Sequence, residues 1–270
     1  RCHHCGAARV LPRTCPECLG ANLLTAGLGT EQTEEFLHRE FNRWPVYRVD
    51  SDSMQGRGAM QAMVDEIHRG EPCILLGTQM LAKGHHFPAV NLVAVIDTDA
   101  LLFSPDFRGE ERMAQLLTQV AGRAGRDRLP GQVLVQTHHP DHPLLQTLLH
   151  HGYDGFAHAA LSERDEAGLP PYRHMALLRC EAIKPEAAVS FMDSAREQLN
   201  NFADQTVEVF GPLPAPMEKR AGRYRMQLIL QSRQRKPLHQ ALQPWTHSLN
   251  TLKSGSRVRW SIDVDPYDTY

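Results

Sequence analysis

The stretch that decides the fold class is Cys73-Ile74-Leu75-Leu76-Gly77-Thr78-Gln79-Met80-Leu81-Ala82-Lys83-Gly84. Its first four residues are apolar without interruption, which is typical of a short strand buried on both faces of a sheet. A loop that begins at Gly77 follows at once. In a parallel sheet, ligands bind where such loops leave the carboxyl ends of strands. The stretch therefore predicts a buried parallel strand followed by a ligand-binding loop.

Strands and helices alternate on both sides of this stretch. Further short apolar strands are predicted at 46–49, 92–96 and 132–136, with helices at 60–68 and 110–125. Alternation of this kind is typical of an α/β domain in which helices cover both faces of a parallel sheet.

The composition excludes several classes of protein. The chain has 270 residues, of which 41% are hydrophobic and 22% charged, so it is long and apolar enough for two folded domains or one large one. No apolar run approaches the roughly 20 residues that span a bilayer, and because residues near Arg1 form no apolar run we expect no secretory signal. Six cysteines are too few for a disulfide scaffold, and we expect a cytoplasmic location. Because the sequence begins with Arg1 and a cysteine pair, we also expect a piece of a longer protein.

Two cysteine pairs open the chain. Cys2 and Cys5 form one C-x-x-C unit, and Cys15 and Cys18 form another. Zn²⁺ takes four such thiolates in a tetrahedron, so the spacing predicts a zinc site in preference to reduced thiols or a disulfide. The remaining cysteines, Cys73 and Cys180, lie in apolar runs and are predicted to be small buried hydrophobic residues.

A second notable loop is Gln119-Val120-Ala121-Gly122-Arg123-Ala124-Gly125-Arg126. Gln119, Arg123 and Arg126 are spaced so that they share one face of a helix. Each of the two glycines costs a helix about 1 kcal/mol relative to alanine. Because the chain keeps both glycines, we predict that another group must come close to the backbone here, beside Arg123 and Arg126.

The last hundred residues follow a different pattern. After Leu169-Pro170-Pro171 the predicted order is strand, helix, strand, strand, helix, strand, an α+β (βαββαβ) arrangement with an antiparallel sheet. The elements are predicted at 175–182, 185–202, 206–210, 224–230, 236–252 and 258–264. Trp245 and Trp260 are possible base-stacking platforms. The helical spacing of Trp245 with Leu238 and Leu242 favours the core for that residue.

Basic residues cluster in the same region. Lys219, Arg220 and Arg223 are predicted in a loop, and Arg225 is predicted to point away from the core face of the following strand. Such a cluster suits phosphate contact, which positions a protein without reading sequence. The alternative is structural: Arg223 or Arg225 would pair with Asp263 or Asp265 on the last strand.

Several of these stretches resemble a known family. Gln-x-x-Gly-Arg-x-Gly-Arg at 119–126 resembles motif VI of superfamily 2 helicases, and Gly77–Gly84 resembles their motif V. An ordered set of further stretches is similar, more narrowly, to the primosomal (PriA) family of replication-restart helicases: Gly29-Thr30-Glu31, Asp97-Thr98-Asp99, Ser104-Pro105-Asp106-Phe107-Arg108, Leu169-Pro170-Pro171-Tyr172, Gly211-Pro212, Pro214-Ala215-Pro216, Gly222-Arg223-Tyr224-Arg225 and Asp263-Val264-Asp265-Pro266. The resemblance runs from Cys2 to Pro266.

The resemblance implies four parts. Residues 1–22 belong to a zinc-binding region, 23–150 to a second RecA-like helicase lobe, 151–172 to a helical linker and 173–270 to a C-terminal α+β domain. The implied function is that of the C-terminal portion of an ATP-dependent 3′→5′ DNA helicase. Such a helicase recognises stalled replication forks and initiates primosome assembly.

The implied site residues follow the motifs. Arg126 is the candidate arginine finger, Arg123 would contact phosphate or the lobe interface, and Gln119 would position the nucleotide or link it to DNA. Thr78, Lys83 and Gly84 would contact the DNA backbone or couple it to the nucleotide state. The sequence contains neither Gly-x-x-x-x-Gly-Lys-Ser/Thr nor a DEAH-type box, so we expect half of an ATPase site and no activity from this chain alone.

The implied cofactors are ATP with Mg²⁺, and two zinc ions in an interleaved pattern shared with upstream cysteines. This pattern differs from the single zinc site that the four cysteines predict by themselves. The implied partners are forked and single-stranded DNA, the single-stranded-DNA-binding protein and other primosome proteins, with no membrane. Two alternatives stay open: another superfamily 2 DNA translocase, and a non-catalytic zinc-ribbon DNA-binding adaptor.

Overall fold

The computed structural model describes residues 29–49, 58–78, 90–122 and 131–269, with Thr14 and Ala124 as single positions. The chain divides into two compact units. The amino-terminal unit contains the described residues up to Ser104, and Gly109–Ala157. The carboxyl-terminal unit contains the described residues from His158 onward and, in addition, the short segment Pro105–Arg108.

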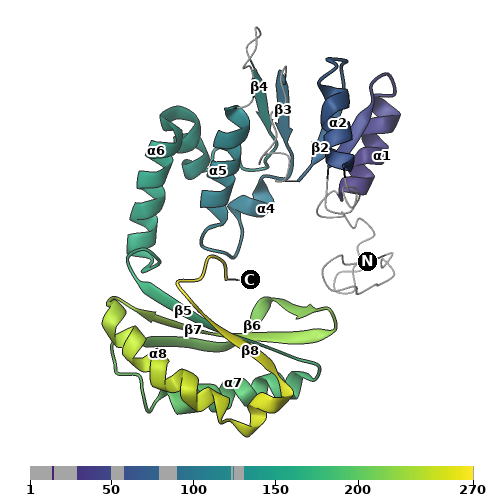
Figure 1. Ribbon diagram of the computed structural model, residues 1–270. Helices are drawn as coiled ribbons and strands as arrows, with labels where there is room; N and C mark the ends of the chain where they lie inside the picture. The colour runs from purple at the N-terminus through teal and green to yellow at the C-terminus, as the bar shows by residue number, and fades with distance from the viewer. Residues whose placement is uncertain are drawn as a thin grey trace. The chain divides into compact units, whose positions relative to one another are not determined.

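The amino-terminal unit alternates helices and short strands (Figure 1). Its elements are α1 (Thr30–Glu40), β1 (Val46–Val49), α2 (Ala59–Ile67), β2 (Ile74–Gly77), β3 (Leu92–Val95), α4 (Asp99–Leu102), α5 (Gly109–Ala121), β4 (Gln132–Val135) and the first part of α6 (Pro143–Glu166). A small core forms where Met63, Val64 and Ile67 of α2 pack against Val49 of β1. The boundary between the units falls within α6, whose regular geometry is interrupted at Gly152 (φ 69°, ψ −170°).

The strands of this unit do not form the single sheet that the sequence predicted. Among the described residues, β1 pairs with β2 and β3 with β4, each as a separate two-stranded parallel sheet. The strands are also less buried than expected. Every residue of β2 is only partly buried, and Leu92 of β3 and Leu134 of β4 are 52% and 57% exposed. A strand buried on both faces needs helices on both sides, and among the described helices none covers the face that bears Leu92 and Leu134.

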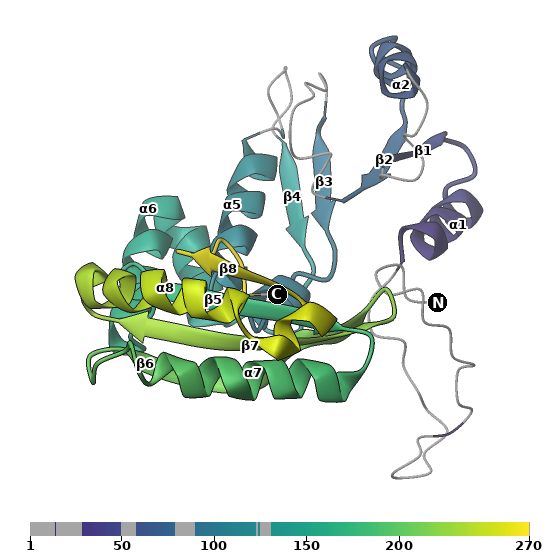
Figure 2. The same ribbon diagram turned by 60° about the horizontal axis from the view of Figure 1, so that its bottom comes forward.

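The carboxyl-terminal unit has the element order β5 (His174–Ala182), α7 (Pro185–Leu199), β6 (Glu208–Arg220), β7 (Arg223–Ser232), α8 (Arg235–Asn250), η1 (Lys253–Arg257) and β8 (Arg259–Val264). The strands form one antiparallel sheet in the order β6-β7-β5-β8. Both helices lie against the same face of this sheet (Figures 1 and 2).

The core of this unit lies between the helices and the sheet. Alternate residues of the central strands, including Ala176, Leu178, Leu228 and Leu230, face Phe191 and the other apolar residues of the helices. The side chain of Trp245 is fully buried there, and its indole Nε1–H donates to the carbonyl oxygen of Ala195 at 2.8 Å. Trp260 is partly buried and stacks on Phe191, with ring centroids 6.2 Å apart. Trp245 is therefore closed to a stacking base, and Trp260 packs against the core.

Several helices and strands end at other residues than the sequence predicted. β6 extends to Arg220, so Lys219 and Arg220 lie on a strand and not in a loop. A run with Pro212, Pro214 and Pro216 argues against a strand, but β6 is an edge strand, where the missing N–H groups cost no ladder hydrogen bond.

Helix α8 runs through Pro244 without dividing, and α5 ends at Ala121, just before Gly122. Within the described ranges, every helix is too short or too polar to cross a bilayer.

Candidate nucleic-acid interface

The carboxyl edge of the β3-β4 sheet carries a cluster of polar groups. Because Val95 pairs with Val135, the residues that follow the two strands meet at one edge. Asp99 lies there: its Oδ1 accepts a hydrogen bond from the hydroxyl of Thr137, and its Oδ2 accepts the backbone N–H of His138 at 2.9 Å. The imidazole Nδ1 of His138 lies 2.8 Å from the same oxygen. These bonds, above all that from Thr137, lower the pKa of Asp99 to about 2.

This edge therefore holds a carboxylate that is ionised at neutral pH. Asp97, two residues before Asp99, has a positive φ of 56°, an uncommon conformation for a residue with a side chain. In the sequence, Asp97-Thr98-Asp99 carries a family resemblance but no predicted role. The signal that was available is their place directly after a strand of a parallel pair.

The helicase-motif residues are described only in part. Thr78 follows β2 and is exposed, and Gln119 is exposed near the end of α5. The remaining predicted residues, Lys83, Gly84, Arg123 and Arg126, lie outside the described residues. So do the zinc candidates Cys2, Cys5, Cys15 and Cys18. Within the described part of the chain, no three His, Cys, Asp or Glu side chains gather so as to hold a metal ion.

Of the two other cysteines, Cys180 is buried as its apolar run predicted, whereas Cys73 is only partly buried. Cys180 is 3% exposed and belongs to the core of the carboxyl-terminal unit. Burial raises the pKa of its thiol to about 12. Cys73 is partly buried, and burial also raises its pKa. These are packing residues and not reactive thiolates.

Arginines gather on the sheet face opposite α7 and α8, which we call the helix-free face. Arg220 of β6 is paired in register with Arg223 of β7, and Arg225 of β7 with Glu181 of β5. Glu181 is paired in turn with Arg259 of β8. Because its neighbours Cys180 and Ala182 belong to the core, Glu181 and its cross-strand partners point to the other face. Arg225 thus points away from the core, as its alternation predicted.

Positive charge exceeds negative charge on this part of the face. Glu181 is shared by Arg223, at 3.9 Å, and Arg259, at 3.6 Å. Burial lowers the pKa of Arg225 below its ordinary value, and the charges of Arg220 and Arg179 lower it further. Two arginines directly opposite on paired strands, such as Arg220 and Arg223, repel each other. An anion at this place would relieve that repulsion.

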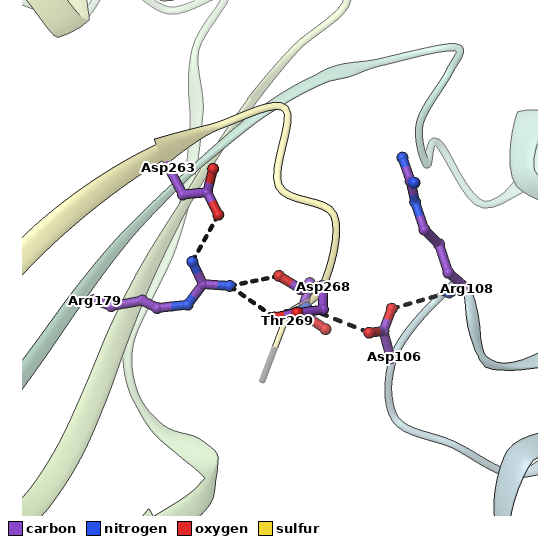
Figure 3. Close-up of polar contacts among 6 residues, drawn as sticks. All are labelled: Asp106, Arg108, Arg179, Asp263, Asp268 and Thr269. Atoms are coloured by element: carbon purple, nitrogen blue, oxygen red, sulfur yellow. Dashed lines mark hydrogen bonds and ion pairs between the residues drawn. The ribbon is translucent and has the colours of Figure 1, made fainter. Parts of the chain in front are cut away.

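Two predicted partners differ in the structure. Asp263 pairs with Arg179 of β5, whose Nη1 donates to its carboxylate at 2.8 Å, and not with Arg223 or Arg225 (Figure 3). The Nζ of Lys219 donates to the hydroxyl of Tyr224 at 3.2 Å and lies 4.4 Å from the centroid of its ring. Lys219 is therefore engaged with a neighbour on the β6-β7 hairpin, whereas Arg259, which sequence reasoning missed, joins the helix-free face.

Comparison with known families now places the chain. A model described as "Helicase conserved C-terminal domain" matches residues 23–128, and one described as "Primosomal protein N C-terminal domain" matches residues 165–267. The chain thus joins a RecA-like C-terminal helicase domain to a primosomal C-terminal domain. It is 47% identical over 268 residues to replication restart protein PriA of Haemophilus influenzae, and 35% identical over 267 residues to that of Bacillus subtilis. The chain belongs to the PriA family of replication restart proteins.

The relatives are much longer than this chain. The aligned residues make up 99% of the chain but only 36% of the Haemophilus protein and 33% of the Bacillus protein. The relative from Synechocystis is 40% identical over 230 residues, and these residues make up 28% of its length. The chain therefore spans about a third of the length of these proteins.

Proposed function

We propose that this chain is the C-terminal portion of an ATP-dependent 3′→5′ DNA helicase that recognises stalled replication forks and initiates primosome assembly. The observation that carries the proposal is the order of the two matched domains, in a chain aligned almost end to end with replication restart proteins. Replication restart acts on DNA inside the cell, and we therefore propose a cytoplasmic location.

The helicase domain supplies one half of an ATPase site in this proposal. Phosphoryl transfer develops negative charge around the γ-phosphate, and an arginine that reaches in from a neighbouring lobe stabilises that charge. Arg126 is proposed for this role, with Arg123 at the phosphate or the lobe interface and Gln119 as the link between nucleotide and DNA. Thr78, Lys83 and Gly84 are proposed to contact the DNA backbone. ATP and Mg²⁺ would be held by the first helicase lobe, which the family resemblance implies.

The helix-free face is the proposed DNA contact of the carboxyl-terminal unit. Its support is the excess of arginine over carboxylate around Glu181 and the lowered pKa of Arg225. Guanidinium groups bind phosphate oxygens in a bidentate manner without reading bases, which suits a protein that must act on forks of any sequence. Arg220, Arg223, Arg225 and Arg259 are the proposed contacts, and Lys219 adds its charge at the end of the hairpin. The acidic tail of the single-stranded-DNA-binding protein is the alternative ligand, because guanidinium groups also bind carboxylate oxygens in a bidentate manner.

The cysteine pairs are the proposed zinc ligands. Two C-x-x-C units supply four thiolates, the donor set that structural Zn²⁺ prefers. Cys2 and Cys5 would share one zinc ion, and Cys15 and Cys18 a second one, each with a further cysteine pair upstream of this chain.

The direct test is strand displacement by a longer protein, that is, this chain joined to the first helicase lobe that the family resemblance implies. With ATP and Mg²⁺ it should unwind a fork whose loading strand is single-stranded on the 3′ side of the duplex, and this chain alone should hydrolyse no ATP. Unwinding only from a 5′ single strand, or ATP hydrolysis by the isolated chain, would contradict the proposal.

A further inference from the structure

The helix-free face contains an arginine that the proposed DNA contacts do not include. Arg179 lies on the central strand β5, and its neighbours Leu178 and Cys180 belong to the core, so its side chain points to the helix-free face. The next row of paired residues on this face holds Glu181 and Arg225, and such rows lie about 7 Å apart along a strand. Arg179 therefore lies beside the proposed phosphate contacts.

Two acidic residues hold the guanidinium of Arg179 (Figure 3). Its Nη1 donates to the carboxylate of Asp263, on β8, at 2.8 Å. Its Nη2 donates to the carboxylate of Asp268 at 3.1 Å and to the backbone oxygen of the same residue at 2.5 Å. Its Nε is buried and has no hydrogen-bond partner among the residues that the structure describes. The guanidinium is thus bound through both Nη atoms, and its Nε–H is left unsatisfied.

Asp268 belongs to the segment that follows the last strand. β8 ends at Val264, and the backbone N–H of Asp265 donates to the carbonyl oxygen of Met175, near the start of β5, at 2.9 Å. Further along, the carboxylate of Asp268 reaches Arg179. The side chain of Asp268 is 46% exposed and that of Arg179 is 22% exposed. An ion pair that is open to water in this way contributes little stability, so another anion can displace the Asp268 carboxylate.

The charge of Asp268 also acts on Arg225, one of the proposed DNA contacts. Burial lowers the pKa of Arg225, and the charges of Arg220 and Arg179 lower it further. The carboxylates of Glu181 and Asp268 oppose this shift, because negative charge nearby stabilises the charged guanidinium. Asp268 therefore acts on this face as a phosphate group would: it supplies negative charge to Arg225 and an acceptor oxygen to Arg179.

We propose that Arg179 is a further phosphate-binding residue of the helix-free face, and that the Asp268 carboxylate occupies the place of a phosphate group until DNA displaces it. Carboxylate and phosphate oxygens both fit the planar fork of an arginine, so the phosphate accepts from the Nη2 that Asp268 leaves. Asp263 keeps its bond to Nη1 and holds Arg179 in orientation during the exchange. This inference rests on the proposed DNA contact of the helix-free face, and it adds a binding residue and a competing group from the same chain.

The binding of a fluorescent oligo(dT) strand to the full chain, measured by anisotropy over a salt series, tests this competition. Asp268→Asn removes the competing charge and keeps the size of the side chain. We expect the affinity at low salt to rise about three- to tenfold, and the slope of log affinity against log salt to steepen by about one unit, because one more phosphate contact forms. Asp265→Asn is the matched control: it makes the same change of charge in the same segment, at a side chain that is not a partner of Arg179, and the slope should stay as it is.

A double substitution identifies the arginine. In an Arg179→Met background, Asp268→Asn should no longer tighten binding, because the residue that takes the phosphate is gone. Should Arg179→Met unfold the sheet, Arg179→Lys keeps the charge but not the bidentate fork, and the gain from Asp268→Asn should shrink. Equal tightening by Asp268→Asn and Asp265→Asn, or a gain that persists in full without the guanidinium of Arg179, would overturn the proposal. So would a lower melting temperature of Asp268→Asn at unchanged affinity, since that is the result of a purely structural clamp.

The proposed DNA contact can fail separately from this inference. If Arg225→Glu weakens binding while Asp268→Asn has no effect, the helix-free face binds DNA and only the competition by Asp268 is wrong. If neither substitution changes the affinity or the salt slope, the face does not bind phosphate and both claims are wrong. ATP takes no part in these measurements, so they do not depend on the helicase activity proposed for the longer protein.

Discussion

The carboxylate of Asp106 accepts the backbone N–H of Thr269, a contact between residues 163 positions apart in the chain. Asp106 lies in a four-residue segment that interrupts the amino-terminal unit, and Thr269 follows the last strand of the other. The Asp106-Phe107-Arg108 stretch, notable in sequence only for its resemblance to a family, thereby acquires a physical role.

Asp106→Ala should destabilise the carboxyl-terminal unit by about 1–3 kcal/mol, because it takes the acceptor away from the partly buried N–H groups of Arg108 and Thr269. Urea denaturation followed by circular dichroism measures this loss. Asp204→Ala is the control, since Asp204 is an exposed carboxylate that accepts hydrogen bonds from Thr206 in its own turn. Equal effects of the two substitutions would show that the contact to Thr269 adds nothing.

Arg225→Glu should weaken the binding of single-stranded oligonucleotides, whatever their sequence. The slope of log affinity against log salt should fall by about one unit for each lost phosphate contact. Fluorescence anisotropy over a salt series gives both quantities. Lys184→Glu makes the same change of charge at the start of α7, on the helix-covered side of the sheet. If both variants keep the original slope, the helix-free face does not bind phosphate.

Asp99 should make the amino-terminal unit sensitive to acid. Its pKa is about 2 in the folded chain, against an ordinary value of 3.8, so its hydrogen bonds stabilise the fold fully above about pH 4. This stabilisation is lost as the pH falls from about 4 to about 2. Asp99→Asn should flatten the dependence of unfolding free energy on pH in that window. A titration of the Asp99 carboxyl carbon by NMR with a midpoint near 4 would contradict the assignment.

Trp245 should matter for stability and not for DNA. Trp245→Phe removes the hydrogen bond to Ala195 and should cost about 1–2 kcal/mol, whereas Trp245→Ala also leaves a large cavity and should cost about 3–5 kcal/mol. Thermal and urea denaturation check the order of these losses. An unchanged stability of Trp245→Phe combined with weaker oligonucleotide binding would instead indicate base stacking.

Local patterns in the sequence predicted the elements well where periodicity is strong. The alternation of Met226, Leu228 and Leu230 placed Arg225 away from the core, and helical spacing placed Trp245 within it. The prolines of 212–216 concealed the length of β6, because the sequence does not show that this strand lies at an edge, where proline is tolerated.

Contacts distant in the chain were not predictable from these patterns. Nothing local to Asp106 indicates that it meets Thr269, and nothing local to Arg179 indicates that it binds Asp268. Pairing of the four short parallel strands also depends on segments far apart in sequence, so alternation predicted strands but not two separate sheets. Arg259 was missed for a related reason: its place beside Glu181 follows from strand register.

The most direct test of the central claim is the effect of Arg126→Ala on DNA-stimulated ATP hydrolysis by the longer protein. If Arg126 stabilises the charge that develops on the γ-phosphate, kcat should fall about 10³-fold or more, with a much smaller change in KM for ATP. Arg128→Ala, two residues further along, should leave kcat near its original value. Near-normal turnover by Arg126→Ala in a folded protein would contradict the account.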